Sequence, residues 1–305
     1  MNFNVIYDEF LKFKKLKLKP QSFRSLKSRF ESYILPYFKN KNIENITIDD
    51  YIDWQIEIEK FDFKYSYKKQ LHYSFVSLYG YLILFGKYTV NVPKIVGNFK
   101  NNELGSNIEY WSYQEFKKFE NSFSNNDIVY KVFFTLLFRT GLREGEALAL
   151  TFNDIKGDIL YITKTISKEH YAGEKIISSP KSRTSIRNIR IDSYTLKCLN
   201  KLKIYYKKKL GYYEDSFNIF GATKYISITS INRKKNYYCE KCNLKRIRIH
   251  DFRHSHATLL LQKGIDIIEV SRRLGHSDIN TTIKTYSHCE KEHEKRVIET
   301  LNSLN

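Results

Sequence analysis

The chain has 305 residues, 42% of them hydrophobic, which excludes a disordered or fibrous protein and predicts two domains with cores of their own. A formal net charge of +19 favours a polyanionic partner, and four cysteines are too few for a disulfide framework. The sequence shows neither a signal peptide nor an apolar stretch of membrane-spanning length, so we expect a cytoplasmic protein without a membrane partner. The net charge by itself does not exclude a ribosome-associated protein.

The first hundred residues predict a unit of four helices. Apolar residues recur at helical spacing over residues 5–15, in a second helix that opens at Pro20, after a capped start at Thr47, and over about residues 66–85. The second and fourth helices each show a polar, basic face that suits a grip on a DNA backbone, although a solvated surface explains it nearly as well. The DNA-binding candidates are Arg24, Lys27, Ser28, Lys68 and Lys69 in this unit, together with Arg183 further along the chain.

A polar, Asn-rich stretch with two glycines follows and predicts a linker at residues 98–109. This places one domain at residues 1–97 and a second at 110–305. In the second domain, helices are expected to end at Gly141, to begin at Glu144, and to cover 193–210, 251–263, a segment capped by Asp266, and about 290–301. A turn at Ser277-Asp278 precedes the segment that holds Tyr286.

Three strands are predicted between the helices of the second domain, at residues 159–163, 174–178 and 186–191. The last two flank residues 179–184 and predict a hairpin whose tip carries Lys181 and Arg183. The fold class that follows is mainly α, with a small antiparallel β-sheet in the second domain.

The second domain contains every residue type that transfer at a phosphodiester requires. Such a reaction needs a nucleophile in line, cations on the non-bridging oxygens and an acid for the leaving oxygen. Tyr286 can be the nucleophile, although a tyrosine with its ordinary pKa of about 10 needs help. The cations and acids available are Arg143 and Arg253 at helix starts, Lys181 on the hairpin tip, and His250 and His276. Each alone is more simply a cap, core or surface residue, but together they form one ordered set.

Metal sites are less well supported by the sequence. Cys239-x-x-Cys242 supplies two of the four ligands that a structural zinc needs, so free thiols in a basic loop are expected there. A cluster of His250, His254 and His256 is opposed by the positive charge of Arg253 between them. We therefore predict no metal.

Four separated motifs resemble those of the tyrosine recombinase (phage integrase) family. They are Thr140–Leu150 with its Gly-Leu-Arg, His250-x-x-Arg253, Leu274-Gly275-His276, and Tyr286, with Lys181 in the expected hairpin as a fifth. The resemblance covers about residues 110–290 and implies an α+β catalytic domain. The helical unit resembles the SAM-like core-site DNA-binding domain of the family by placement and pattern alone.

The resemblance implies a role for each residue of the set. Arg143 and Arg253 would clamp the scissile phosphate, and Lys181 would protonate the leaving 5′ oxygen. His250 would assist proton transfer from Tyr286, His276 would hydrogen-bond a non-bridging oxygen, and Glu146 would support the site. Tyr286 would form a 3′-phosphotyrosine without a metal, ATP or other cofactor.

The family also implies partners. They are double-stranded DNA at specific core sites and three further copies of the chain, with the final helix of each subunit docked on a neighbour. An accessory DNA-bending or directionality factor and association with the nucleoid fit the same picture. At this length we expect no additional arm-site-binding domain, as in the Xer recombinases, yet the motif wording is closer to integrases of Gram-positive phages and integrative elements. Integration or excision of an element and chromosome-dimer resolution both stay open.

Three rival functions use parts of the same residue set. A type IB topoisomerase would share the chemistry but relax DNA without a specific site. A basic DNA-binding regulator would have no need of Tyr286. A metal-dependent nuclease would lose its activity in EDTA.

Overall fold

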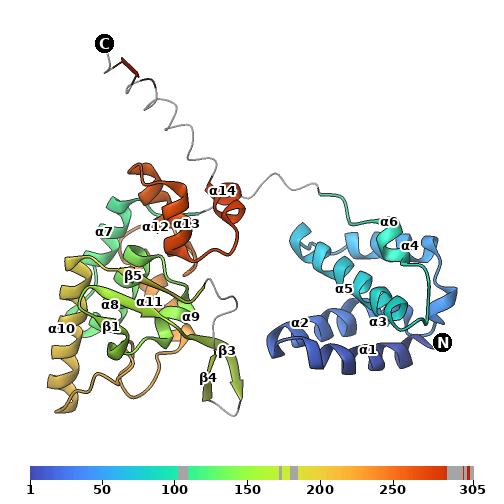
Figure 1. Ribbon diagram of the computed structural model, residues 1–305, viewed down its shortest axis with the longest axis horizontal. Helices are drawn as coiled ribbons and strands as arrows, with labels where there is room; N and C mark the ends of the chain where they lie inside the picture. The colour runs from blue at the N-terminus through green and yellow to red at the C-terminus, as the bar shows by residue number, and fades with distance from the viewer. Residues whose placement is uncertain (102–108, 172–173, 179–184, 287–297, 299–300, 303–305) are drawn as a thin grey trace. The chain divides into compact units, whose positions relative to one another are not determined.

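The computed structural model describes residues 1–101, 109–171, 174–178, 185–286, 298 and 301–302. The chain forms two compact units, residues 1–106 and 107–305 (Figure 1). Both are mainly helical, and the second also contains small antiparallel sheets, as the sequence predicts. Within the described ranges, no helix combines the length and the apolar character that a membrane span requires.

The first unit is built from helices whose starts are marked in the sequence. Pro20 occupies the first turn of its helix, and the Thr47 side chain accepts a hydrogen bond from the Asp50 amide in a capping box. All four predicted helices are present. The elements are α1 (Phe3–Lys17), α2 (Pro20–Arg29), a π-helical turn (Phe30–Ile34), α3 (Leu35–Phe38), a 3₁₀ turn (Ile43–Asn45), α4 (Ile48–Glu59), α5 (Tyr65–Leu84) and α6 (Val92–Val96).

Aromatic side chains fill the core of this unit. Phe38, Trp54 and Phe75 pack around one another with ring centroids 5.0–6.2 Å apart. Phe99, which falls in the predicted linker, is also buried and lies 5.9 Å from Trp54 between ring centroids. The ordered packing of the first unit therefore extends at least to Phe99.

The named elements of the second unit run from α7 to α14. Its helices are α7 (Tyr113–Asn121), α8 (Ile128–Thr140), α9 (Glu144–Ala149), α10 (Ser193–Leu210), α11 (Ile228–Lys241), α12 (Asp251–Gln262), α13 (Ile267–Leu274) and α14 (Ile279–Tyr286), with 3₁₀ turns at Asn125–Asp127 and Phe152–Asp154. Its strands are β1 (Ile155–Lys156), β2 (Ile159–Ile162), β3 (Thr165–Tyr171), β4 (Glu174–Ser178) and β5 (Arg187–Arg190).

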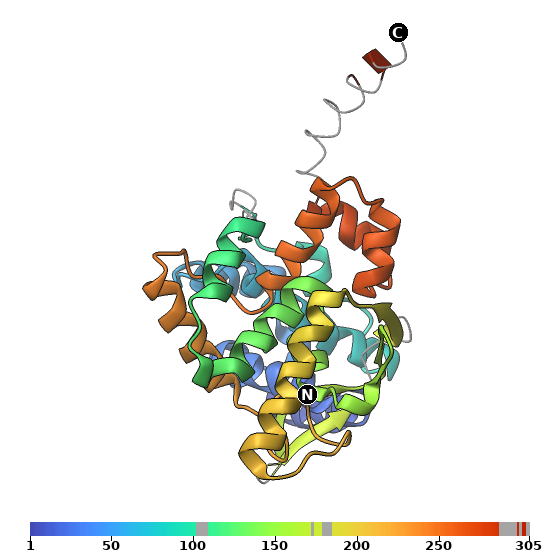
Figure 2. The same ribbon diagram turned by 90° about the vertical axis from the view of Figure 1, so that its left-hand side faces the viewer.

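Helices α12, α13 and α14 lie together in this unit (Figures 1 and 2). The main core joins α7, α8 and α12, where Phe116, Phe134 and Phe252 are fully buried. A smaller cluster holds α12, α13 and α14 together through Val270, Leu274 and their neighbours. This second cluster is where the segment with Tyr286 is anchored.

The predicted hairpin between residues 174–178 and 186–191 is wrong. Strand β4 pairs instead with β3, in which Ile166 lies opposite Ile177, and β5 pairs with β2, in which Leu160 lies opposite Ile189. Only two residues separate β3 from β4 in the sequence, so these strands meet at the smallest cost of loop closure. Leu160 and Ile189 are both buried, which favours the β2–β5 pairing in the order β1-β2-β5. Lys181 and Arg183 lie outside the described residues.

The basic loop predicted around Cys239-x-x-Cys242 is also wrong. Cys239 lies on α11 and Cys242 directly follows this helix, and both side chains are buried. Burial raises the pKa of the Cys239 thiol to about 11, which disfavours the thiolate that a metal would need. In the part of the chain that the structure describes, no three His, Cys, Asp or Glu side chains gather in a way that could hold a metal.

Candidate active site

Arg143 is set in place by the turn between α8 and α9. Helix α8 ends at Gly141, whose φ of 68° is a left-handed conformation that favours glycine. A Cβ atom at Gly141 would also lie 2.6 Å from the ring of His256. The turn therefore requires glycine twice over, and it positions Arg143 as the N-cap residue of α9.

Glu146 joins Arg143 to a second arginine, Arg187 of β5. Arg143 Nη1 donates to Glu146 Oε1 at 2.8 Å, and Arg187 Nη2 donates to Glu146 Oε2 at 3.0 Å. Burial of Glu146 would raise the pKa of its carboxyl, but the hydrogen bond and charge of Arg187, together with Arg143, hold that pKa below its ordinary value. Glu146 is thus an ionised support that orients Arg143.

Arg253 lies near the start of α12 and is 2% exposed. Its Nη1 donates to the carbonyl oxygen of Gly141 at 2.8 Å. Its Nη2 is buried and has no hydrogen-bond partner among the described residues. Burial and the charge of Arg143 lower the pKa of Arg253 to about 9. A buried guanidinium with an unused donor beside another arginine is suited to bind an anion.

Two histidines surround the arginines. Desolvation and the positive charges of neighbouring groups, His254 first for His250 and Arg253 first for His276, lower the pKa of each to about 4. His276 follows Gly275, whose carbonyl oxygen accepts a hydrogen bond from Arg143 Nη2 at 3.3 Å. His276 Nδ1 and Thr282 Oγ1 lie 2.6 Å apart, which ties His276 to α14. Both imidazoles are neutral near pH 7 and can exchange hydrogen bonds with a phosphate.

Tyr286 ends α14 and is 2% exposed. Its ring packs in the small cluster with Ala257, Leu261 and Leu274, and its hydroxyl lies 2.8 Å from His254 Nδ1. Tyr286 is also among the groups whose electrostatic effect raises the pKa of Arg253. The structure therefore brings Arg143, His250, Arg253, His276 and Tyr286 into one site.

Sequence reasoning gave no role to Arg187 and His254. His254 follows His250 by one helical turn, so a shared helix face was the available signal. Arg187 had none, because a strand that holds both Arg187 and Arg190 does not show which of them reaches a distant carboxylate.

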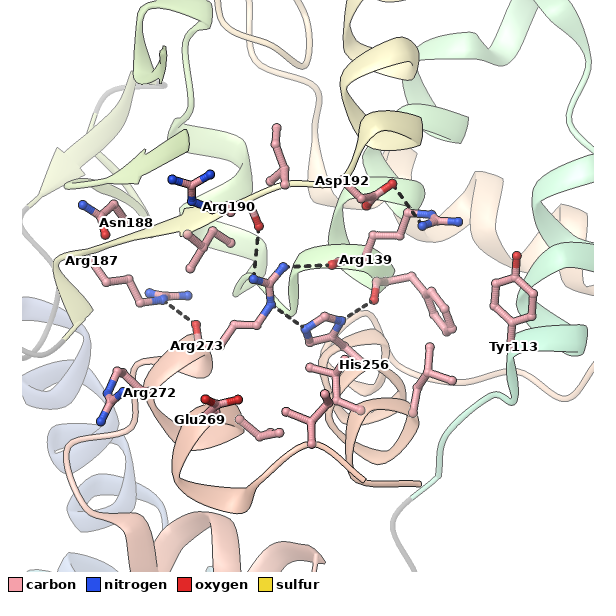
Figure 3. Close-up of a pocket in the computed structure, with 17 residues that line it drawn as sticks. Tyr113, Arg139, Arg187, Asn188, Arg190, Asp192, His256, Glu269, Arg272 and Arg273 are labelled. Atoms are coloured by element: carbon pink, nitrogen blue, oxygen red, sulfur yellow. Dashed lines mark hydrogen bonds and ion pairs between the residues drawn. The ribbon is translucent and has the colours of Figure 1, made fainter. Parts of the chain in front are cut away.

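A second cluster of His and Arg lies beside the site, in the wall of an open cavity of about 870 Å³ (Figure 3). His256 Nδ1 donates to Phe138 O at 2.8 Å, and Arg273 Nε donates to His256 Nε2 at 3.1 Å. Arg273 also donates to the carbonyl oxygens of Arg190 at 3.1 Å and Arg139 at 3.3 Å. This cluster ties α12, α13, α8 and β5 together.

Comparison with known proteins accounts for this arrangement. Residues 111–293 match the model of the phage integrase family, and residues 2–58 match the N-terminal SAM-like domain of phage integrases. The chain belongs to the phage integrase family. Its resemblance to the tyrosine recombinases, and the mainly helical fold that follows from it, are confirmed.

The relatives of this integrase-family chain include named integrases and recombinases. It is 35% identical over 203 residues to the ICEBs1 integrase of Bacillus subtilis, covering 65% of this chain and 55% of that protein. It is 26% identical to a XerC-like tyrosine recombinase of Caldanaerobacter subterraneus, covering 90% of this chain and 77% of that protein. The chain thus spans about half the length of the first of these relatives.

Solved structures share the fold. The Tn1549 transposon integrase, solved with a circular intermediate DNA, superposes with a TM-score of 0.78 at 14% identity, covering 97% of this chain and 99% of that one. A lambda integrase dimer bound to a core site gives a TM-score of 0.66 at 17% identity, covering 93% and 77%. At these identities the likeness concerns the fold alone.

The DNA-binding candidates of the SAM-like unit differ in how available they are. Arg24, Lys27 and Ser28 on α2 and Lys69 on α5 are exposed. Lys27 lies 3.5 Å from the Glu31 carboxylate, a weak exposed pair. Lys68 is half-buried and paired with Glu59, so part of its charge is already neutralised.

Proposed function

We propose that this chain is a tyrosine-type site-specific DNA recombinase that cleaves and rejoins strands through a 3′-phosphotyrosyl intermediate on Tyr286. The observation that carries the proposal is the buried Nη2 of Arg253, which has no hydrogen-bond partner among the described residues and lies in the same site as Tyr286. A phosphodiester would supply the acceptor that this donor lacks, and Tyr286 would be the nucleophile that attacks it.

The roles of the site residues follow from their surroundings. Arg143 and Arg253 hold the non-bridging oxygens of the scissile phosphate, and Glu146 and Arg187 keep Arg143 oriented. His276 donates a hydrogen bond to the phosphate, and His250, whose ring lies 5.0 Å from that of His254 between centroids, assists proton movement near Tyr286 indirectly. Lys181 protonates the 5′ oxygen as it leaves. Because the phosphodiester becomes a phosphotyrosyl ester, its bond energy is kept for rejoining, and the proposed chemistry uses no metal or ATP.

The partners in this proposal are double-stranded core sites and three further copies of the chain. Arg24, Lys27, Ser28, Lys68 and Lys69 grip the DNA backbone from the SAM-like unit, and Arg183 does so beside Lys181. The C-terminal helix docks on a neighbouring subunit, and the 54% exposure of both Ile298 and Leu301 supports this exchange, because each offers apolar surface to a partner. An accessory DNA-bending or directionality factor and a place on the nucleoid belong to the same proposal.

Substitution of the nucleophile tests the function. Tyr286→Phe is expected to keep DNA binding by gel shift but to form no covalent complex on nicked duplexes made from the DNA that flanks the gene. Tyr237→Phe, an exposed tyrosine of α11, is the matched control and is expected to form the complex like the natural protein. A covalent complex that survives in Tyr286→Phe would overturn the assignment.

Measurements on the natural protein separate the rival functions. Relaxation of a plasmid without a specific site would indicate a type IB topoisomerase. Binding without any covalent complex in the natural protein would indicate a DNA-binding regulator. Loss of cleavage in EDTA would indicate a metal-dependent nuclease.

A further inference from the structure

The hydroxyl of Tyr286 is held by a histidine that the sequence motifs do not single out. His254 Nδ1 lies 2.8 Å from that hydroxyl, and the two rings lie 5.8 Å apart between centroids at an angle of 58°. His254 directly follows Arg253 on α12. The helix that positions the anion-binding guanidinium therefore also positions the partner of the nucleophile.

Both side chains of this hydrogen bond are restrained. Tyr286 is almost fully buried among Ala257, Leu261 and Leu274, so its side chain has little freedom to move its hydroxyl away from α12. His254 is half-buried, and its ring lies edge-on to that of His250 at 5.0 Å between centroids. A contact fixed on both sides is prepared before DNA arrives.

We propose that His254 is the residue that orients the Tyr286 hydroxyl and accepts its proton as the nucleophile attacks. The proposal rests on the recombinase function above. The phenol donates its hydrogen to Nδ1, which leaves an oxygen lone pair free to face phosphorus. As the Oη–P bond forms, the proton moves to His254 Nδ1 and the P–O5′ bond breaks, and the 5′ oxygen takes a proton from Lys181. Rejoining reverses each step and returns the proton to Tyr286.

The protonation state of His254 fits this role. Burial lowers its pKa, Asp251 opposes that shift, and Arg248 and Arg253 reinforce it, so the imidazole is neutral near pH 7. A neutral imidazole has one nitrogen lone pair with which to accept a proton. The titratable and charged groups around His254 are Asp251 and Arg253 on α12, Arg248 and His250 just before α12, and Tyr286 on α14.

The first experiment measures the hydrogen bond without DNA. 3-Fluorotyrosine placed at position 286 gives one fluorine resonance, and a second protein labelled at position 237 is the control. His254→Asn, His254→Phe and His250→Asn are compared. We expect both His254 variants to move the resonance at 286 and to leave the one at 237 in place. A resonance at 286 that ignores His254 and moves with His250→Asn would overturn the proposal.

The second experiment measures the reaction. The substrate is a nicked duplex that carries the site mapped by covalent capture with the natural protein. His254→Asn keeps an acceptor for the phenol but cannot take up its proton, so we expect adduct formation to slow about 100-fold, with DNA binding unchanged. In the natural protein the rate should fall as pH drops through the pKa of His254, and His254→Asn should lose the His254 contribution to this dependence.

The two experiments fail separately. An unchanged rate in His254→Asn would overturn the proposal even if the natural protein is a recombinase. Absence of any adduct with the natural protein would overturn the recombinase function, and the fluorine resonance would still decide whether His254 holds the hydroxyl.

Discussion

Helix α12 carries a histidine–arginine cluster on each of two faces, and the two clusters differ in one respect. On one face, Arg273 and His256 have hydrogen-bond partners at every ring nitrogen and on all three guanidinium nitrogens. On the other face, the Nη2 of Arg253 is buried without a partner in the described chain. His254 and His256 are two positions apart, which on a helix places them on opposite sides.

The difference separates residues that hold the fold from residues that await a ligand. A saturated buried network stabilises the folded chain, because breaking it leaves several polar groups unpaired. A buried charge with an unused donor destabilises the folded chain, because the hydrogen bonds that it makes do not fully offset the free energy of removing the charge from water. The lowered pKa of Arg253 agrees with this view, since it shows that the fold disfavours the charge of that residue.

The largest effect expected from this comparison concerns Arg253. Arg253→Met should reduce the rate of adduct formation on the nicked duplex by about 100- to 1,000-fold, because a donor to the developing charge is lost. Its free energy of unfolding should fall less than that of Arg273→Met, since the lost hydrogen bond to Gly141 is offset by removal of a poorly compensated charge. The rate of adduct formation and unfolding in urea are measured for both variants. If Arg253→Met is less stable than Arg273→Met, the comparison between the two clusters is wrong.

A smaller effect, on stability, is expected at Arg273. Arg273→Met leaves His256 Nε2 and the carbonyl oxygens of Arg139 and Arg190 without their donor, so the free energy of unfolding should fall by about 3 kcal/mol. Fluorescence of Trp111 reports on the second unit alone in a Trp54→Phe background, since the chain has two tryptophans. Arg272→Met, an exposed neighbour on α13, is the control and should unfold like the parent protein.

The smallest effect is a pH dependence from His256. Burial and the charge of Arg273 lower its folded-state pKa to about 3, whereas an unfolded histidine titrates near 6.5. Between these values unfolding takes up one proton, so this residue removes stability as pH falls, by about 1.4 kcal/mol per pH unit near pH 5. His256→Gln should lessen the slope of stability against pH by that amount. An unchanged slope would show that His256 is not held neutral by its network.

The helices could be predicted where their ends carry local signals. Pro20, Thr47, Gly141 and Asp266 each act on the backbone within one turn, so a short window of sequence contains the cause of the start or stop. Helix α11 could not be predicted, because Arg, Lys and Asn interrupt its apolar residues. Only the packing against the core shows that Ile231, Tyr238 and Cys239 are its buried side chains.

The pairing of strands could not be predicted in the same way. Strand β4 is apolar enough to pair on either side. Its partner β3 is mostly polar and shows no alternation of apolar and polar residues, so the sequence did not indicate it as a strand. Likewise Phe99 reads as linker by composition, but its ring fills a place beside Trp54 that only the folded helices create.

The sequence by itself determined which residue types the site can use. Phosphoryl transfer requires particular side chains, and the chain contains a tyrosine, arginines, histidines and a lysine in one order. Only the tertiary structure decided which of these arginines and histidines have a full set of hydrogen-bond partners and which keep an unused donor. Arg253 meets the Gly141 carbonyl across 112 residues of chain, and Tyr286 meets His254 across 32. Whether a buried polar group finds a hydrogen-bond partner depends on which groups the fold brings within about 3 Å of it and shields from water, and neither condition is local in sequence.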